Sequence, residues 1–129
     1  MFQNLDVFRL SHAMAVHAGT RQAVVAQNLA NADTPGYEAR DVAPFNTLID
    51  THAQQFTIKA TRAAHLNAPM GPLQIDVSPR DGAQADPNGN SVSLEAEMLH
   101  AVDVKRQHDR AVAIYKSALG VLRTAVSVR

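Results

Sequence analysis

Apolar side chains near the start of the chain recur at intervals of three, four and seven residues. This spacing places them on one face of an α-helix, with polar residues such as Arg21 and Gln22 between them. The pattern predicts an amphipathic helix from about residue 5 to about residue 32, close to 40 Å long at about 1.5 Å per residue. Its apolar stripe comprises Val7, Leu10, Met14, Ala18, Val25, Leu29 and Ala32.

A turn signal follows this helix directly. Pro35 removes an amide donor and Gly36 accepts a positive φ, so residues 34–37 predict a type II turn with these two residues at its centre. The turn motif consists of Thr34, Pro35, Gly36 and Tyr37.

The last third of the chain carries a heptad pattern whose steps alternate between four and three residues. It predicts a helix of about 34 residues, roughly 50 Å long. Ser91 or Ser93 is expected to cap its start, and Glu95 and Glu97 place negative charge where the helix dipole favours it. The stripe comprises Leu94, Met98, Ala101, Lys105, His108, Val112, Tyr115, Leu119, Leu122 and Val126, with two polar members in its middle.

Helical periodicity disappears between residues 38 and 90, where five of the six prolines lie. Turns are expected to dominate there. Phe56 and Ile58, and then Leu73, Ile75 and Val77, alternate with other residues as in short strands, which predicts a small β-hairpin. The sequence thus predicts a mainly α chain with segments 1–37, 38–90 and 91–129 that together form one domain.

Composition removes several classes of function. The 129 residues carry 12 basic and 12 acidic side chains, so the zero net charge gives no basic excess for nucleic acid. Cysteine is absent, which excludes disulfides and thiolate sites. No stretch approaches the roughly 20 apolar residues of a membrane span. Residues 1–6 lack the features of a cleaved secretion signal.

Candidate chemistry is sparse. Among the six histidines, His12 and His17 are five residues apart and His100 and His108 are eight apart, so neither pair has the helical spacing of a zinc site. They are expected to be solvated or part of the apolar stripes. Nucleotide-binding and nucleophile motifs are also missing from the sequence, which predicts no cofactor, no bound metal and no enzymatic activity. An enzyme that uses Asp41 and His65 would need a pocket for which the sequence gives no sign.

The two apolar stripes need partners. Antiparallel pairing of the terminal helices buries one side of each, and the middle segment is long enough to turn the chain around. Apolar surface left in water favours packing against further copies, whereas a monomeric bundle closed by the middle segment is the alternative. A soluble dimeric adaptor or export chaperone also fits two long helices.

Residues 26–37, Ala-Gln-Asn-Leu-Ala-Asn-Ala-Asp-Thr-Pro-Gly-Tyr, resemble the N-terminal signature of flagellar rod, hook and related axial proteins. Residues 88–98, Asn-Gly-Asn-Ser-Val-Ser-Leu-Glu-Ala-Glu-Met, are similar to the second signature of this family, which opens the C-terminal helix. Residues 38–45, 61–66 and 119–125 look most like the proximal rod branch, and the short length fits it.

The resemblance implies a structural subunit of the proximal rod in the flagellar basal body, part of the shaft that transmits torque. It also implies a periplasmic location, reached through the flagellar type III export apparatus without a cleaved signal. The implied partners are further copies of the chain, the rod proteins FlgC, FlgF and FlgG, the junction protein FliE, and the export gate within the MS ring.

Under this hypothesis the terminal helices pair loosely before assembly and become fixed in the growing rod. Asn28 and Asn31 are expected to bond either the turn in their own chain or a neighbouring subunit. The predicted assembly interface comprises Leu10, Met14, Val25, Asn28, Leu29, Asn31, Leu94, Met98, Val112, Tyr115, Leu119 and Leu122.

Overall fold

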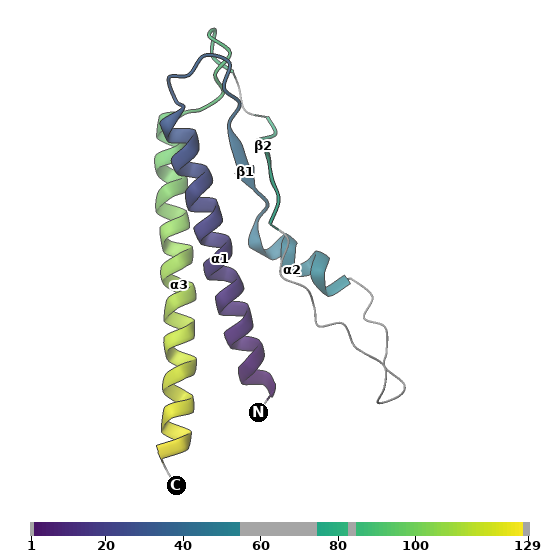
Figure 1. The fold of residues 1–129 in the computed structure, drawn as a ribbon, viewed down its shortest axis with the longest axis vertical. Coiled ribbons are helices and arrows are strands. Elements are labelled where there is room, and N and C mark those ends of the chain that lie inside the picture. The colour runs from purple at the N-terminus through teal and green to yellow at the C-terminus, as the bar shows by residue number, and fades with distance from the viewer. Residues whose placement is uncertain (1, 55–74, 83–84, 128–129) are drawn as a thin grey trace.

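The computed structural model describes residues 2–54, 75–82 and 85–127. Two long helices, α1 (Phe2–Ala30) and α3 (Leu94–Ser127), lie side by side and run in opposite directions, so that both chain termini are at the same end (Figure 1). This arrangement confirms the prediction of a mainly helical chain built on an antiparallel pair of terminal helices.

The helix boundaries follow local sequence signals. α1 begins a few residues before the predicted start and ends two residues before the predicted end. α3 has 34 residues, as expected, and Ser93 caps it: the Ser93 carbonyl accepts from the Glu97 amide at 2.9 Å, and its Oγ accepts from the Ala96 amide at 3.4 Å. Glu95 and Glu97 both lie in the first turn, where the helix dipole favours negative charge.

The middle segment contains a two-stranded antiparallel sheet, although its strands differ from the predicted hairpin. β2 (Val77–Pro79) includes the predicted residue Val77 but pairs with β1 (Arg40–Val42), with Val42 opposite Val77 and Arg40 opposite Pro79. The predicted strand positions Phe56, Ile58 and Leu73 lie outside the described residues. β1 packs against α1, which therefore lies between α3 and the strand pair (Figure 1).

A third helix, α2 (Phe45–Gln54), follows β1 and corrects the expectation that turns dominate residues 38–90. Pro44 precedes its first residue, and the Pro44 carbonyl accepts hydrogen bonds from the amides of Thr47 and Leu48 at 3.1 and 3.4 Å. Amide groups at the start of a helix have no carbonyl partner within the helix, so the N–H that proline lacks is not missed there. Phe45, Leu48 and Ile49 have the spacing of one helix face, but a segment of 10 residues is too short for this spacing to identify a helix.

Small side chains form the contact between α1 and α3. Ala18 and Val25 on α1 pack with Val104 on α3, and Ala101 borders this cluster. The buried positions on α3 recur every seven residues, at Glu97, Val104 and Ala111. Small residues let the two helices approach closely along this row. Tyr115 of the predicted stripe also contacts α1, because its ring meets that of Phe8 edge-on with the centroids 5.2 Å apart.

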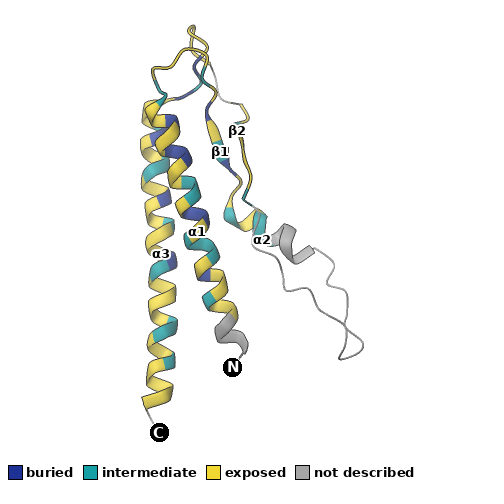
Figure 2. Cartoon of the chain, in the orientation of Figure 1, coloured by how far each residue is buried: buried dark blue, intermediate teal, exposed yellow. Residues whose placement is uncertain are grey.

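Several large side chains of the predicted C-terminal stripe remain exposed. Leu94, Met98 and Tyr115 are exposed, whereas Val112 and Leu119 are half-buried. Most residues of α3 are exposed, whereas the buried residues of α1 lie in its middle and upper parts (Figure 2). The helix pair therefore leaves much of its apolar stripe in solvent.

Candidate assembly surface

The side of α1 that faces the strand pair carries polar residues that hold the main chain beside it. Asn28 is fully buried; its Nδ2 donates to the Arg40 carbonyl at 2.8 Å, and its Oδ1 accepts from the Arg40 amide at 3.0 Å. The Asn28 carboxamide thus pairs with the Arg40 backbone as a neighbouring strand would. Tyr37 adds a longer contact of 3.4 Å from its hydroxyl to the same Asn28 oxygen.

His17 contacts the same segment about three turns earlier on α1. Its Nε2 lies 2.8 Å from the Ala43 carbonyl, so Nε2 carries the proton and donates. Its Nδ1 then accepts from Gln107 Nε2 on α3 at 3.0 Å. His17 is fully buried and stacks obliquely on Phe45 with ring centroids 5.4 Å apart.

This burial corrects the expectation that His17 is solvated or part of an apolar stripe. The histidine lies in a polar contact that joins α1, α3 and the β1–α2 connection. Its partners are distant in the sequence, so helical spacing alone gave no sign of them. His12 and His108 are exposed.

Two arginines and two carboxylates link α1, the strand pair and α3. Arg21 on α1 lies 3.5 Å from Asp41 on β1, and Arg80 after β2 lies 3.7 Å from the other oxygen of the same carboxylate. Arg80 Nη1 also lies 2.7 Å from Glu97 Oε1 on α3. The Glu97 side chain is fully buried, so Glu97 serves as a buried ion-pair partner as well as a helix-start charge.

Asn90 joins the end of α1 to the start of α3. Its Nδ2 lies within donor distance of three carbonyl oxygens, those of Asn31, Ala32 and Thr34, at 2.9, 2.7 and 2.9 Å. Its Oδ1 accepts from the Val92 amide at 2.8 Å. Asn90 therefore binds main-chain carbonyl groups of the turn that follows α1 and holds this turn to the start of α3.

The turn after α1 has the features expected from its sequence. The Tyr37 amide donates to the Thr34 carbonyl at 3.3 Å, and Gly36 has φ of +72°, as a type II turn requires at its third residue. The Gly36 amide donates to the Asn88 carbonyl at 3.1 Å, which attaches the turn to the loop before α3.

The loop before α3 is held to the turn by two further bonds. The Ser91 amide donates to the Tyr37 carbonyl at 3.0 Å, and Ser91 Oγ accepts from the Ala39 amide at 2.8 Å. We use the term polar clamp for the residues whose hydrogen bonds join this end of the molecule: Asn28, Gly36, Tyr37, Arg40, Asn88, Asn90 and Ser91.

Of the two partners expected for Asn28 and Asn31, the structure contains those within the chain. Asn28 binds Arg40, as described above, and Asn31 Nδ2 donates to the Gln27 carbonyl at 2.8 Å while its Oδ1 accepts from Thr34 Oγ1 at 3.3 Å. Val25 is also buried inside the chain. In this conformation Asn28 and Val25 present almost no surface to another molecule.

Other members of the predicted interface do face solvent. Leu10 on α1 is 49% exposed and Met98 on α3 is 57% exposed. Met14, Val112, Leu119 and Leu122 are half-buried. We use the term outward apolar face for all exposed large apolar residues of the two helices, which lie on more than one side of each helix: Val7, Leu10, Val16, Leu29, Leu94, Met98, Leu99, Val102, Ile114, Tyr115, Val121 and Val126.

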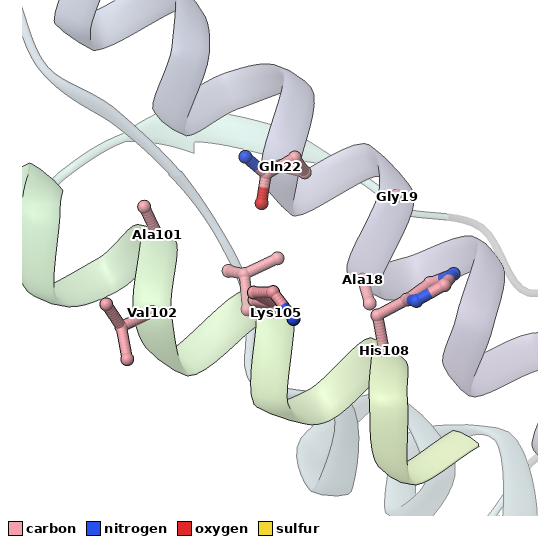
Figure 3. Close-up of a pocket in the computed structure, with 8 residues that line it drawn as sticks. Ala18, Gly19, Gln22, Ala101, Val102, Lys105 and His108 are labelled. Atoms are coloured by element: carbon pink, nitrogen blue, oxygen red, sulfur yellow. The ribbon is translucent and has the colours of Figure 1, made fainter. Parts of the chain in front are cut away.

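A groove of about 600 Å³ runs between α1 and α3 in the middle of the pair. Small residues shape it, with Ala18 and Gly19 on one helix and Ala101 on the other, and the residues that line it come only from the two helices (Figure 3). Lys105 and His108, the two polar members of the heptad stripe, also line the groove. Because the lining of the groove is mainly apolar, it suits an apolar segment better than a polar ligand.

The polar groups beside the groove are engaged with each other on the surface of α3. Lys105 Nζ donates to Asp109 Oδ2 at 2.9 Å, one helical turn away. This hydrogen bond and the positive charge of Lys105 lower the pKa of the Asp109 carboxyl below its usual value. The pair supports the isolated helix and is fully exposed, so its contribution is small.

Two other kinds of site have no support in the described part of the chain. Residues 2–54, 75–82 and 85–127 contain no cluster of three or more side chains that could hold a metal ion. Within the same ranges, no helix combines the length and the apolar character that a membrane span requires. Asp41 is bound by two arginines, and His65 lies outside the described residues.

Comparison with known proteins points to one family. The sequence model described as flagella basal body rod protein matches residues 17–37, which include His17, Asn28 and the turn motif. A protein of Agrobacterium fabrum named flagellar basal body rod protein FlgB is 36% identical over 122 residues, which cover 89% of this chain and 88% of the relative.

Proteins with the same name in other organisms are also similar. The protein of Cereibacter sphaeroides is 28% identical over 116 residues, which cover 89% of this chain and 90% of the relative. That of Proteus mirabilis is 33% identical over 102 residues, which cover 69% of this chain and 72% of the relative. The similarity therefore extends over both helices and the segment between them.

Proposed function

Because the chain belongs to the flagellar basal body rod protein family and is a structural subunit of that rod, we propose that it polymerises through the outward apolar face of α1 and α3. The exposure of this face is the observation that carries the proposal. Leu94, Met98 and Leu99 at the start of α3 are 49%, 57% and 69% exposed. A lone subunit gains nothing from keeping such residues in water.

Burial against neighbouring subunits supplies the driving force. Covering one Leu or Met side chain stabilises an interface by about 1.5–3 kcal/mol, and the face repeats such residues along both helices. The groove lined by Ala18, Gly19 and Ala101 lets an incoming apolar helix approach the pair closely. Neighbouring subunits thus continue the helix packing that begins within the chain.

The polar clamp and the outward face have complementary roles. The clamp fixes α1, α3 and the strand pair relative to one another through directional hydrogen bonds, so torque applied to one helix passes to the whole subunit. The outward face then transfers it to the next subunit through many side-by-side contacts. Rigidity within the subunit and adhesion between subunits therefore depend on different residues.

The specific partners that we propose are further copies of the chain, the rod proteins FlgC, FlgF and FlgG, the junction protein FliE, and the export gate within the MS ring. We also propose that the subunit works in the periplasmic part of the basal body and arrives through the flagellar type III apparatus without a cleaved signal. Membership in the family supports both proposals, and the absence of cysteine suits a chain that crosses an export channel unfolded.

The substitution Met98→Asp tests the proposal. Met98 lies near the start of α3, where an acidic side chain suits the helix dipole, so the variant should fold. In a strain whose only copy carries Met98→Asp, we expect basal bodies without a complete rod and loss of motility, because an unpaired charge would enter an apolar interface.

Ala113→Asp provides the matched control. Ala113 is exposed on α3, and its neighbours one helical turn away are the polar residues Asp109, Arg110, Lys116 and Ser117. This variant adds the same charge outside the apolar face and should retain motility. Normal rods in the Met98→Asp strain, at normal protein levels, would refute the proposed interface.

A dimeric adaptor or chaperone is the alternative function, and the similarity to rod proteins does not favour it. A chaperone would remain in the cytoplasm after export of its cargo, whereas a rod subunit is recovered in purified basal bodies. Fractionation of cells with an antibody against this chain separates the two functions.

A further inference from the structure

The polar clamp contains a dipeptide with its own chemistry. Asn88 is the only asparagine of the sequence that is followed by glycine. In an Asn-Gly pair, the glycine amide nitrogen can attack the asparagine side chain with little steric hindrance, because glycine has no Cβ. Asn88 is exposed to solvent, so water reaches this position.

We propose that Asn88 is a site of spontaneous deamidation and that the folded clamp protects it. In the reaction, Gly89 N bonds to Asn88 Cγ, the bond from Cγ to Nδ2 breaks, and ammonia leaves with the proton of the Gly89 amide. Water then opens the cyclic succinimide. Opening at Cγ yields aspartate, and opening at the main-chain carbonyl carbon yields isoaspartate.

Each group that must move for ring closure is held in the structure. The Gly89 amide donates to the Asp86 carbonyl at 2.8 Å, and the side-chain Oδ1 of Asn88 accepts from the Asn90 amide at 3.0 Å. The main-chain carbonyl of Asn88 accepts from the Gly36 amide at 3.1 Å. Deprotonation of Gly89 N and rotation of the Asn88 side chain therefore require local opening of the clamp, as amide hydrogen exchange does.

Isoaspartate at this position would loosen the junction of the two helices. It adds a negative charge, and it reroutes the main chain through Cβ and Cγ of residue 88, which moves the carbonyl that binds Gly36. Gly89 also packs closely on this turn, since a Cβ on Gly89 would lie 3.4 Å from Gly36 Cα. An unfolded chain is therefore expected to deamidate at Asn88 with time and to lose the ability to form this junction, whereas the folded chain is protected from deamidation.

The test follows the whole purified chain at mildly alkaline pH, in native buffer and in concentrated urea, with peptide mapping and isoaspartate-specific methylation of each peptide. We expect aspartate and isoaspartate at residue 88 in urea and formation at least about tenfold slower in native buffer, because the clamp must open first. Asn90, whose next residue is Ser91, serves as the internal control and should remain intact far longer.

A pair of variants tests the protection by the clamp. Asn90→Ala removes the bonds to the end of α1 and should raise the native rate at residue 88 toward the rate in urea. Asn46→Ala, at an exposed site on α2, should leave it unchanged. Equal rates in native buffer and urea, or no modification of residue 88 in either, would overturn the proposal, and this outcome does not depend on whether Asn90→Ala folds.

Discussion

Arg80 Nη1 lies 2.7 Å from Oε1 of Glu97, and the glutamate side chain is fully buried. Neither carboxylate oxygen of Glu97 accepts a hydrogen bond of acceptable geometry within the described part of the chain, so the contact with Arg80 is an ion pair. Arg80 is therefore the counter-ion on which the buried charge depends. The pair also connects β2 to α3, whereas β1 connects β2 to α1.

Arg80→Ala should destabilise the chain by about 3–5 kcal/mol, because it leaves the Glu97 charge buried without compensation. The double variant Arg80→Ala with Glu97→Gln should recover part of the loss, since the amide carries no charge. Urea unfolding monitored by circular dichroism measures both. If the single and the double variant were equally unstable, the ion pair would not be the reason for the loss.

Asn90→Asp replaces an amide donor with an acceptor that faces three carbonyl oxygens. We expect a loss of about 3 kcal/mol, because these part-buried hydrogen bonds lose their donor and the carbonyl oxygens face a negatively charged carboxylate. Asn46→Asp, an exposed change of the same chemistry, is the control. Thermal unfolding of both variants gives the comparison, and equal midpoints would show that the clamp contributes little.

Gly36→Val should weaken the turn after α1. The residue has φ of +72°, and an added Cβ would meet no atom within 4 Å, so the cost is conformational. A left-handed conformation costs a β-branched residue at least about 1–2 kcal/mol, whereas Gly36→Asn should be tolerated better. Swarming on soft agar should be impaired for the valine variant. Wild-type motility of that strain would argue against a role for the turn.

Gly19→Ala should stabilise the isolated chain by about 1 kcal/mol, because the residue lies inside α1 and a Cβ there meets no atom within 4 Å. The same position lines the groove, so Gly19→Leu should retain the helix but obstruct docking of a neighbour. Helix content by circular dichroism and motility together separate these effects. A motile Gly19→Leu strain would exclude the groove from the interface.

The pKa of Asp109 offers a test of the surface charges of α3. Lys105→Met should raise this pKa toward its ordinary value, because the hydrogen bond and the positive charge are lost. Since the folded-state pKa lies below the unfolded one, the pair contributes stability above the usual aspartate range, and this contribution disappears as the pH falls through the lowered pKa. Nuclear magnetic resonance titration of the carboxyl measures the shift, and an unchanged pKa would show that the pair does not persist in solution.

The sequence was sufficient to predict the two long helices, because their periodicity extends over many turns and needs no knowledge of distant contacts. The turn at Pro35 and Gly36 was predictable for the same local reason. α2 was missed because ten residues give a weak periodic signal, and β1 was missed because only three residues pair with β2.

The pattern predicted part of the contact row between the helices, because Ala18 and Val25 on α1 and Ala101 on α3 belong to the predicted stripes. It missed Val104 and Ala111, because the large residues of the C-terminal stripe, such as Leu94 and Met98, follow a different row. Asn90 of the polar clamp bonds to Asn31, which lies 59 positions earlier in the chain. Periodicity along the sequence cannot predict a hydrogen bond between residues that are so far apart in the chain.

The central claim is that neighbouring subunits cover the outward apolar face, and thiol labelling tests it most directly. The chain has no cysteine, so Met98→Cys introduces a single thiol at a residue that is 57% exposed in the lone subunit. We predict rapid maleimide labelling of the purified chain, protection of the same thiol in purified basal bodies, and labelling again once denaturant has dissociated them. Equally rapid labelling in intact basal bodies would contradict the account.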